Sequence, residues 1–140
     1  MIWHENGQIA EKAIYKNGEL NGFLLEFSPN GQQLLSAGYK NGQKWGLEKK
    51  WYSSGPQSAI IFWNEKGRKH NKAESWFTNG NRKTVRLYEN GNLLQAQSWQ
   101  PDGKLNPEVV ENGNGKLVYY DQEGVPTHTQ LFQNGEQVEN

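Results

Sequence analysis

The sequence has no cysteine among its 140 residues. Disulfides and thiolate metal sites are therefore excluded. The absence of cysteine does not indicate whether the protein is in an oxidising or a reducing compartment. No apolar run approaches the roughly 20 residues that a bilayer-spanning helix needs. No charged and then apolar leader precedes the first turn, so we expect a cytoplasmic protein. A secreted or surface-anchored protein is the alternative if a leader has been removed.

Aliphatic side chains are also scarce. Hydrophobic residues make up only 34% of the sequence, and no window repeats apolar residues at 3.6 spacing over three turns, so no helix is predicted. What the chain has instead is 16 Gly, six Trp, six Tyr and five Phe. This composition suits a thin sheet whose apolar surface comes from large rings. It does not suit a thick aliphatic core.

The stretch 39–55, YKNGQKWGLEKKWYSSG, contains the unit from which the chain is built. Asn41-Gly42 is a strong hairpin signal, because a type I′ turn needs positive φ at both positions. Similar turns end at Gly7, Gly18, Gly31, Gly42, Gly55, Gly67, Gly80, Gly91, Gly103, Gly113, Gly124 and Gly135. An aromatic residue stands three or four positions before every turn except that of Gly113, which has Val110. Two turns make a repeat of about 24 residues, as in stacked supersecondary units.

The segments between turns are predicted to be short strands. They cover residues 11–15, 23–27, 33–39, 47–52, 58–63, 73–77, 84–88, 93–99, 108–110, 116–120 and 128–132. Strands joined in order by tight turns pair antiparallel. We therefore predict an all-β fold: a single-layer antiparallel β-meander of eleven to twelve short strands, forming one twisted ribbon of tandem hairpins over residues 1–140.

The aromatic residues divide into two columns, because alternate turns lie at opposite edges of a meander. One column holds Tyr15, Tyr39, Trp63, Tyr88 and Phe132, and the other holds Trp3, Phe27, Trp51, Trp76, Trp99 and Tyr120. Most members of the first precede their glycine by three residues, Trp63 by four, and all of the second by four. This spacing predicts two alternating turn geometries, a tight one and one with an extra residue or bulge. Whether both columns share a face stays open, since a one-residue bulge changes side-chain parity.

The run Tyr15-Lys16-Asn17-Gly18-x-x-x-Gly22 and its copy from Tyr39 to Gly46 resemble the MORN repeat in its bacterial variant form. The likeness extends over nearly the whole chain, but only these two units keep the second glycine. In other units His70-Asn71 and Leu94-Gln95 replace it. The resemblance implies a single-layer ribbon of hairpins. It also implies protein interaction, lipid contact in some members, or an antitoxin or immunity role, and it brings no catalytic residues.

The search for reactive chemistry yields no site. His4, His70 and His128 lie far apart in the repeat order, whereas zinc needs three or four converging ligands. Ser53-Ser54-Gly55 is a turn without the context of a nucleophile elbow. Glu108 and Glu111 could act as an acid–base pair, but nothing apolar flanks them to shift a pKa. We therefore expect no catalytic residue, no cofactor, no metal and no enzyme activity.

The charges balance, with 15 basic and 15 acidic residues, but their distribution along the chain is uneven. Residues 41–86 carry ten basic and three acidic groups, whereas residues 101–140 carry two basic and seven acidic groups. A basic centre can steer association with an acidic partner. Its residues can equally be ordinary solvated strand exteriors. Nucleic-acid binding is disfavoured by the zero net charge.

The sequence thus favours a non-catalytic module that binds another protein, for example a toxin, through its sheet face and basic centre. The candidate partner-binding residues are Lys49, Lys50, Trp51, Arg68, Lys69, Trp76, Arg82 and Arg86. The exposed ring columns could contribute, although most rings are expected to pack on one another. The alternatives are a membrane-peripheral scaffold on anionic lipid and a cell-surface adhesin or carbohydrate-binding ribbon. Exposed edge strands would also permit oligomers.

Overall fold

The fold is all β. A computed structural model describes residues 1–138, in which the chain forms 14 strands and no helix. None of the described residues therefore belongs to a helix that is long and apolar enough to cross a membrane. The chain divides into two compact units, Met1–Arg68 (unit 1) and Lys69–Asn140 (unit 2), and each is described by itself.

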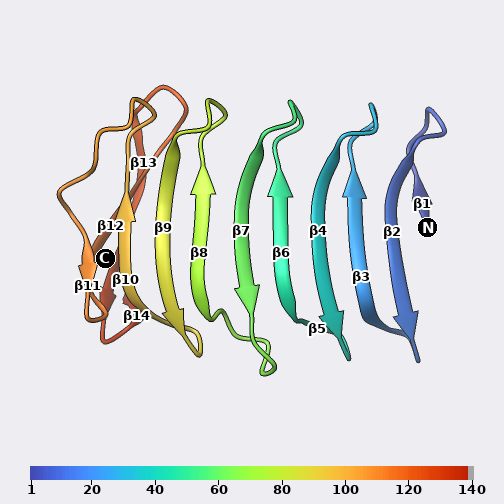
Figure 1. The fold of residues 1–140 in the computed structure, drawn as a ribbon, viewed down its shortest axis with the longest axis horizontal. Coiled ribbons are helices and arrows are strands. Elements are labelled where there is room, and N and C mark those ends of the chain that lie inside the picture. The colour runs from blue at the N-terminus through green and yellow to red at the C-terminus, as the bar shows by residue number, and fades with distance from the viewer. Residues whose placement is uncertain (139–140) are drawn as a thin grey trace. The chain divides into compact units, whose positions relative to one another are not determined.

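Unit 1 is an antiparallel meander in which the strands pair in chain order, except that the short β5 lies off this path (Figure 1). Its strands are β1 (Ile2–Trp3), β2 (Ile9–Lys16), β3 (Glu19–Phe27), β4 (Gln33–Lys40), β5 (Gln43–Lys44), β6 (Gly46–Trp51) and β7 (Gln57–Trp63). The two-residue β5 pairs with the end of β4, and β6 then pairs with the middle of the same strand. Between β5 and β6 the chain bulges at Trp45, whose N–H donates to the Gly38 carbonyl at 2.9 Å.

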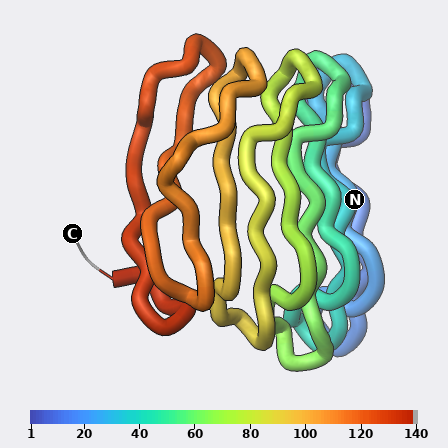
Figure 2. Tube along the Cα trace, turned by 60° about the vertical axis from the view of Figure 1, so that its left-hand side comes forward, coloured from blue at the N-terminus to red at the C-terminus, as the bar shows by residue number. Residues whose placement is uncertain are grey.

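Unit 2 is a meander of the same kind, with its strands side by side in chain order (Figure 2). Its strands are β8 (Asn71–Trp76), β9 (Arg82–Glu89), β10 (Asn92–Ser98), β11 (Val110–Glu111), β12 (Asn114–Tyr120), β13 (Pro126–Gln133) and β14 (Glu136–Val138). Neighbours pair antiparallel throughout. A long loop between β10 and β11 contains a bridge between Trp99 and Leu105, and the Asn106 N–H in this loop donates to the Ser98 carbonyl at 2.9 Å. Across the two-residue β11, β12 also contacts β10, and it contacts β9 as well.

The predicted fold class is confirmed, and each of the eleven predicted segments overlaps a strand. Three very short strands, β1, β5 and β14, were not predicted. The segment 108–110 was predicted wrongly, because the strand there is Val110–Glu111. Its start moves because the Glu108 N–H donates to the Asn106 side chain at 2.7 Å instead of to a neighbouring strand. The prediction of ring-supplied apolar surface is incomplete, since aliphatic side chains fill much of the core of unit 2.

Two turn geometries are present, as the ring spacing predicts. Five tight turns have Asn and Gly both at positive φ: 17–18, 41–42, 90–91, 112–113 and 134–135. Seven wide turns close with two backbone hydrogen bonds and one glycine at positive φ: 4–8, 28–32, 52–56, 64–68, 77–81, 100–104 and 121–125. The alternation fails once, at 64–68. This is the turn that Trp63 precedes by four residues, so the extra residue was already visible in the sequence.

In each unit a side chain that follows one turn also accepts a backbone N–H from a later tight turn. In unit 1, Asn21 accepts the N–H of Asn41 at 3.1 Å. In unit 2, the Nδ1 atom of His70 accepts the N–H of Asn90, also at 3.1 Å. In each case the acceptor residue lies 20 positions before the donor, so the contact ties one hairpin to the next. Asn71, at φ 62, adopts the left-handed conformation that Gly22 and Gly46 adopt at the equivalent repeat position.

The core is thin in unit 1 and better developed in unit 2. The buried apolar side chains of unit 1 are Leu24, Ala37 and Ile61. In unit 2, Leu93, Ala96, Val110, Leu117 and Phe132 form one buried cluster, with Tyr88 and Tyr119 packed against it. Unit 1 therefore leaves more of its apolar surface accessible to solvent.

Candidate functional site

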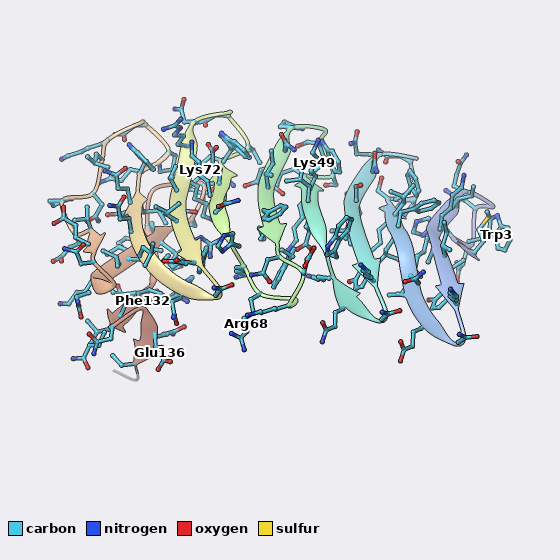
Figure 3. The ribbon with its side chains drawn as sticks, turned by 60° about the horizontal axis from the view of Figure 1, so that its bottom comes forward. Trp3, Lys49, Arg68, Lys72, Phe132 and Glu136 are labelled. Carbon is cyan, nitrogen blue, oxygen red and sulfur yellow. The ribbon has the colours of Figure 1, made fainter. Side chains whose placement is uncertain are left out.

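The candidate residues of unit 1 do not form one patch. Lys49 and Lys50 are consecutive on β6, so their side chains point to opposite faces of the sheet. Lys49 lies between Ser36 and Ile60, whereas Lys50 lies between Leu35 and Ala59. Trp51 is half-buried at the end of β6. Arg68 is exposed in the wide turn after β7, well apart from Lys49 in Figure 3.

The candidate residues of unit 2 mostly contact aromatic rings of the same unit. The Lys69 ammonium lies 5.4 Å from the centre of the Tyr88 ring, and Arg86 lies 5.6 Å from the same ring. Arg86 also donates to the Tyr88 hydroxyl at 3.0 Å. Arg82 is exposed, 5.9 Å from the Trp99 ring, and pairs along the backbone with the half-buried Trp76. These cation–π contacts stabilise the repeat in addition to any role in binding.

One face of unit 1 carries an exposed apolar surface that the sequence reasoning missed. Phe23 and Leu25 on β3, Leu47 on β6, and Ile60 and Phe62 on β7 lie on this face, here called the apolar face. Leu47 pairs directly with Phe62, and Lys49 pairs with Ile60 in the neighbouring row. Phe23 is 43% exposed and Leu47 is 53% exposed. The signal was the alternation in 46–51, which places Leu47 and Lys49 on one face and Glu48 on the other.

The opposite face of β6 buries a carboxylate. Glu48 is only 2% exposed, and its carboxylate accepts from the Lys44 ammonium at 3.0 Å and from the Trp63 indole N–H at 2.9 Å. The same ammonium lies 5.0 Å from the centre of the Trp63 ring. The buried carboxylate thus has a paired cation and a second hydrogen-bond donor, which offset the cost of its burial. Glu48 therefore fixes Lys44 and Trp63 beside the turn that follows β4.

An open cleft of about 440 Å³ lies at this edge of unit 1. It is lined by Lys40, Asn41, Gln43, Lys44, Trp45 and Glu65. The Trp45 side chain is 46% exposed, and the Lys40 ammonium lies 5.9 Å from its ring centre. Neither Trp45 nor this cleft was singled out from the sequence, because Trp45 falls outside the regular ring columns.

The three histidines have structural contacts. His4 Nε2 donates to the Phe27 carbonyl at 2.7 Å, His70 accepts from Asn90, and His128 stacks on Tyr119 with ring centres 4.2 Å apart. All three histidines therefore make specific contacts within the fold, and His128 does so while exposed on β13. Among the described residues no three His, Asp or Glu side chains come together as a metal site would require.

Tyr119 is the centre of a polar cluster in unit 2. Its hydroxyl donates to Gln130 Oε1 at 2.6 Å. Burial raises the pKa of the Tyr119 phenol above its ordinary value of 10.0, and the nearby Arg86 guanidinium partly opposes this rise. The folded chain therefore holds this proton more tightly than the unfolded chain does.

This difference predicts a loss of stability in alkali. Above about pH 10 the unfolded phenol loses its proton while folded Tyr119 keeps it, so the free energy of unfolding falls as pH rises toward the raised pKa. Tyr119→Phe should show a smaller fall between pH 9 and pH 11 in urea unfolding, although it is less stable at both. An equal fall in both proteins would contradict the assignment.

Comparisons with known proteins show no close relative. No protein-family model matches the chain, and no curated protein matches it. Among solved structures, the chain is similar to a chain in a crystal structure of accessory secretory proteins 1, 2 and 3 from Streptococcus pneumoniae. The identity is 14% over 85% of this chain, with a TM-score of 0.37. The chain spans 20% of the length of that protein.

Proposed function

We propose that the chain is a non-catalytic repeat protein that binds another protein through the apolar face of unit 1. The observation that carries this proposal is the pair Phe23 and Leu47, which are 43% and 53% exposed on one face of unit 1. Large apolar side chains gathered on an open sheet face are typical of protein interaction sites. A rigid sheet also loses little entropy when it binds.

The charge of this face favours an acidic partner. Lys49 lies beside Leu47 and Ile60, and Lys12 pairs with Leu25 on the same face. Basic residues around an apolar centre speed the encounter with an acidic surface and help to fix the orientation. Lys49 thus keeps its proposed role, while Lys50, on the other face, would not contact the same partner.

The resemblance to MORN-like repeats supports a binding role of this kind, and an antitoxin or immunity module is its most specific form. The histidine contacts support a non-catalytic role, because each ring is used to hold neighbouring segments together. Binding to anionic lipid through the same lysines is the rival that the test below distinguishes.

Site-specific cross-linking tests the proposal. Because the chain has no cysteine, Leu47→Cys and Lys50→Cys can each carry a single benzophenone label on opposite faces. In extracts of the source cells, the label at 47 should capture one discrete protein at least about tenfold more efficiently than the label at 50. Lys49→Glu should reduce that yield, because it removes a favourable charge.

Two results would contradict the proposal. Equal capture from both positions would indicate non-specific contact. Failure to capture protein, together with co-sedimentation with phosphatidylserine vesicles that Lys49→Glu abolishes, would replace the protein partner by a membrane surface.

A further inference from the structure

The cleft beside Trp45 has walls that are already fixed. On one side, the Asn41 N–H donates to the Asn21 side chain at 3.1 Å, and the Gly42 N–H donates to the Leu20 carbonyl at 2.8 Å. Trp45 is tied to Gly38 through its backbone N–H. Binding would therefore need little ordering of this part of the chain.

The wide turn 64–68 forms the other wall. Asn64 Oδ1 accepts the backbone N–H groups of Lys66 and Arg68 at 3.0 and 3.1 Å. A methyl group at Gly67 would lie 3.1 Å from Oε1 of Gln43, which places the Gln43 side chain against this turn. The buried Glu48 and Lys44 pair holds the inner side. The cleft is thus a preformed hollow with one exposed indole.

The chemistry of the lining is close to neutral. The ammonium of Lys44 is compensated by Glu48 at 3.0 Å. The remaining charges, Lys40 and Glu65, have opposite signs. A strongly anionic ligand would meet the Glu65 carboxylate, and a cationic one would meet Lys40. A neutral ligand encounters neither penalty.

Its polar groups match a ligand that both donates and accepts hydrogen bonds. The carboxamides of Asn41 and Gln43 do both, Glu65 accepts, and Lys40 donates. The exposed indole of Trp45 offers a flat apolar surface with a large contact area. A volume of about 440 Å³ also lies within the range of small-molecule sites. A pyranose ring has these properties: an apolar C–H face and hydroxyls at its edge.

We infer that this cleft is a binding site for a neutral saccharide of one or two pyranose rings. The sugar stacks its C–H face on Trp45, and its hydroxyls bond to Asn41, Gln43, Lys40 and Glu65. The cleft is open and the contacts are few, so the dissociation constant is in the millimolar range, roughly 1 mM. The inference is independent of what the apolar face binds.

Titration followed by NMR tests it on the full chain. The probes are methyl β-glucoside, methyl β-galactoside, N-acetylglucosamine, lactose and cellobiose. At least one should shift the Trp45 indole N–H signal and the Gln43 side-chain amide signals along one saturable curve. The Trp3 indole, which is 58% exposed and outside the cleft, is the internal control and should not move.

Variants distinguish a specific binding site from non-specific binding. Trp45→Ala and Gln43→Ala should each weaken binding at least about tenfold, whereas Trp3→Ala should leave it unchanged. Gln43→Ala removes only an exposed side chain, so it reports on binding even if Trp45→Ala fails to fold. No saturable shift with any of the five sugars, or an equal shift of Trp3, would overturn the inference. Shifts at Trp45 caused by a hexaglutamate peptide but not by sugars would replace the saccharide with an acidic peptide.

Discussion

Replacing Gly38 with alanine is expected to destabilise the folded chain by about 3 kcal/mol. Its φ is not positive, so alanine meets no backbone strain there. The added Cβ would instead lie 2.3 Å from the carbonyl oxygen of Trp45, a backbone atom that cannot turn aside. The bulge at Trp45 must open, and its hydrogen bond to Gly38 is lost with it.

Gly46→Ala is the matched control, eight residues away in the same unit. Gly46 has φ +79, and no atom lies within 4 Å of the place that an added Cβ would take, so the variant carries only conformational strain, about 1 kcal/mol. Urea unfolding of both variants gives the comparison. If Gly38→Ala costs no more than Gly46→Ala, the close approach of Trp45 to Gly38 is wrong. Because the same bulge positions Trp45, Gly38→Ala should also weaken saccharide binding.

The meander could be predicted from the sequence because its determinants are local. An Asn-Gly pair requires positive φ at both residues, and Asn41-Gly42 adopts it as expected. The ring spacing also predicted the one break in the alternation of tight and wide turns. Trp63 precedes its glycine by four residues instead of three, and the turn 64–68 is wide. Strand order then follows directly, because short turns can join only antiparallel neighbours.

The bulge at Trp45 and the burial of Glu48 could not be predicted in this way. Both depend on contacts across strands: Gly38 with Trp45, and Glu48 with Lys44 and Trp63. In the sequence alone, nothing distinguishes Glu48 from the other charged residues of the basic segment. Only its contacts with Lys44 and Trp63 show that it is buried. The start of β11 could not be predicted either. It depends on the Asn106 side chain, which accepts the N–H of Glu108 in place of a neighbouring strand.

The candidate binding site was the part of the protein that the sequence predicted least well. The number of charged residues in a segment does not say which face of the sheet each side chain occupies. Lys49 and Lys50 add to the same basic total but point in opposite directions. In unit 2, Arg86 donates to the Tyr88 hydroxyl. Counting charged residues in the sequence cannot predict this contact. The apolar face could have been predicted from the alternation of side chains along the strands, if Leu47 and Phe62 had been assigned to the same face.

The proposed binding face depends on one difference in exposure: Leu47 on the apolar face is 53% exposed, whereas Ile61 on the opposite face is 8% exposed. Since the chain has no cysteine, the alkylation rates of Leu47→Cys and Ile61→Cys by iodoacetamide measure this directly, with rates in urea as the reference. Leu47→Cys should react on the order of 100-fold faster in the folded chain, because Ile61→Cys must wait for local opening. Equal rates, or faster reaction at position 61, would contradict the strand register and the proposed binding face together.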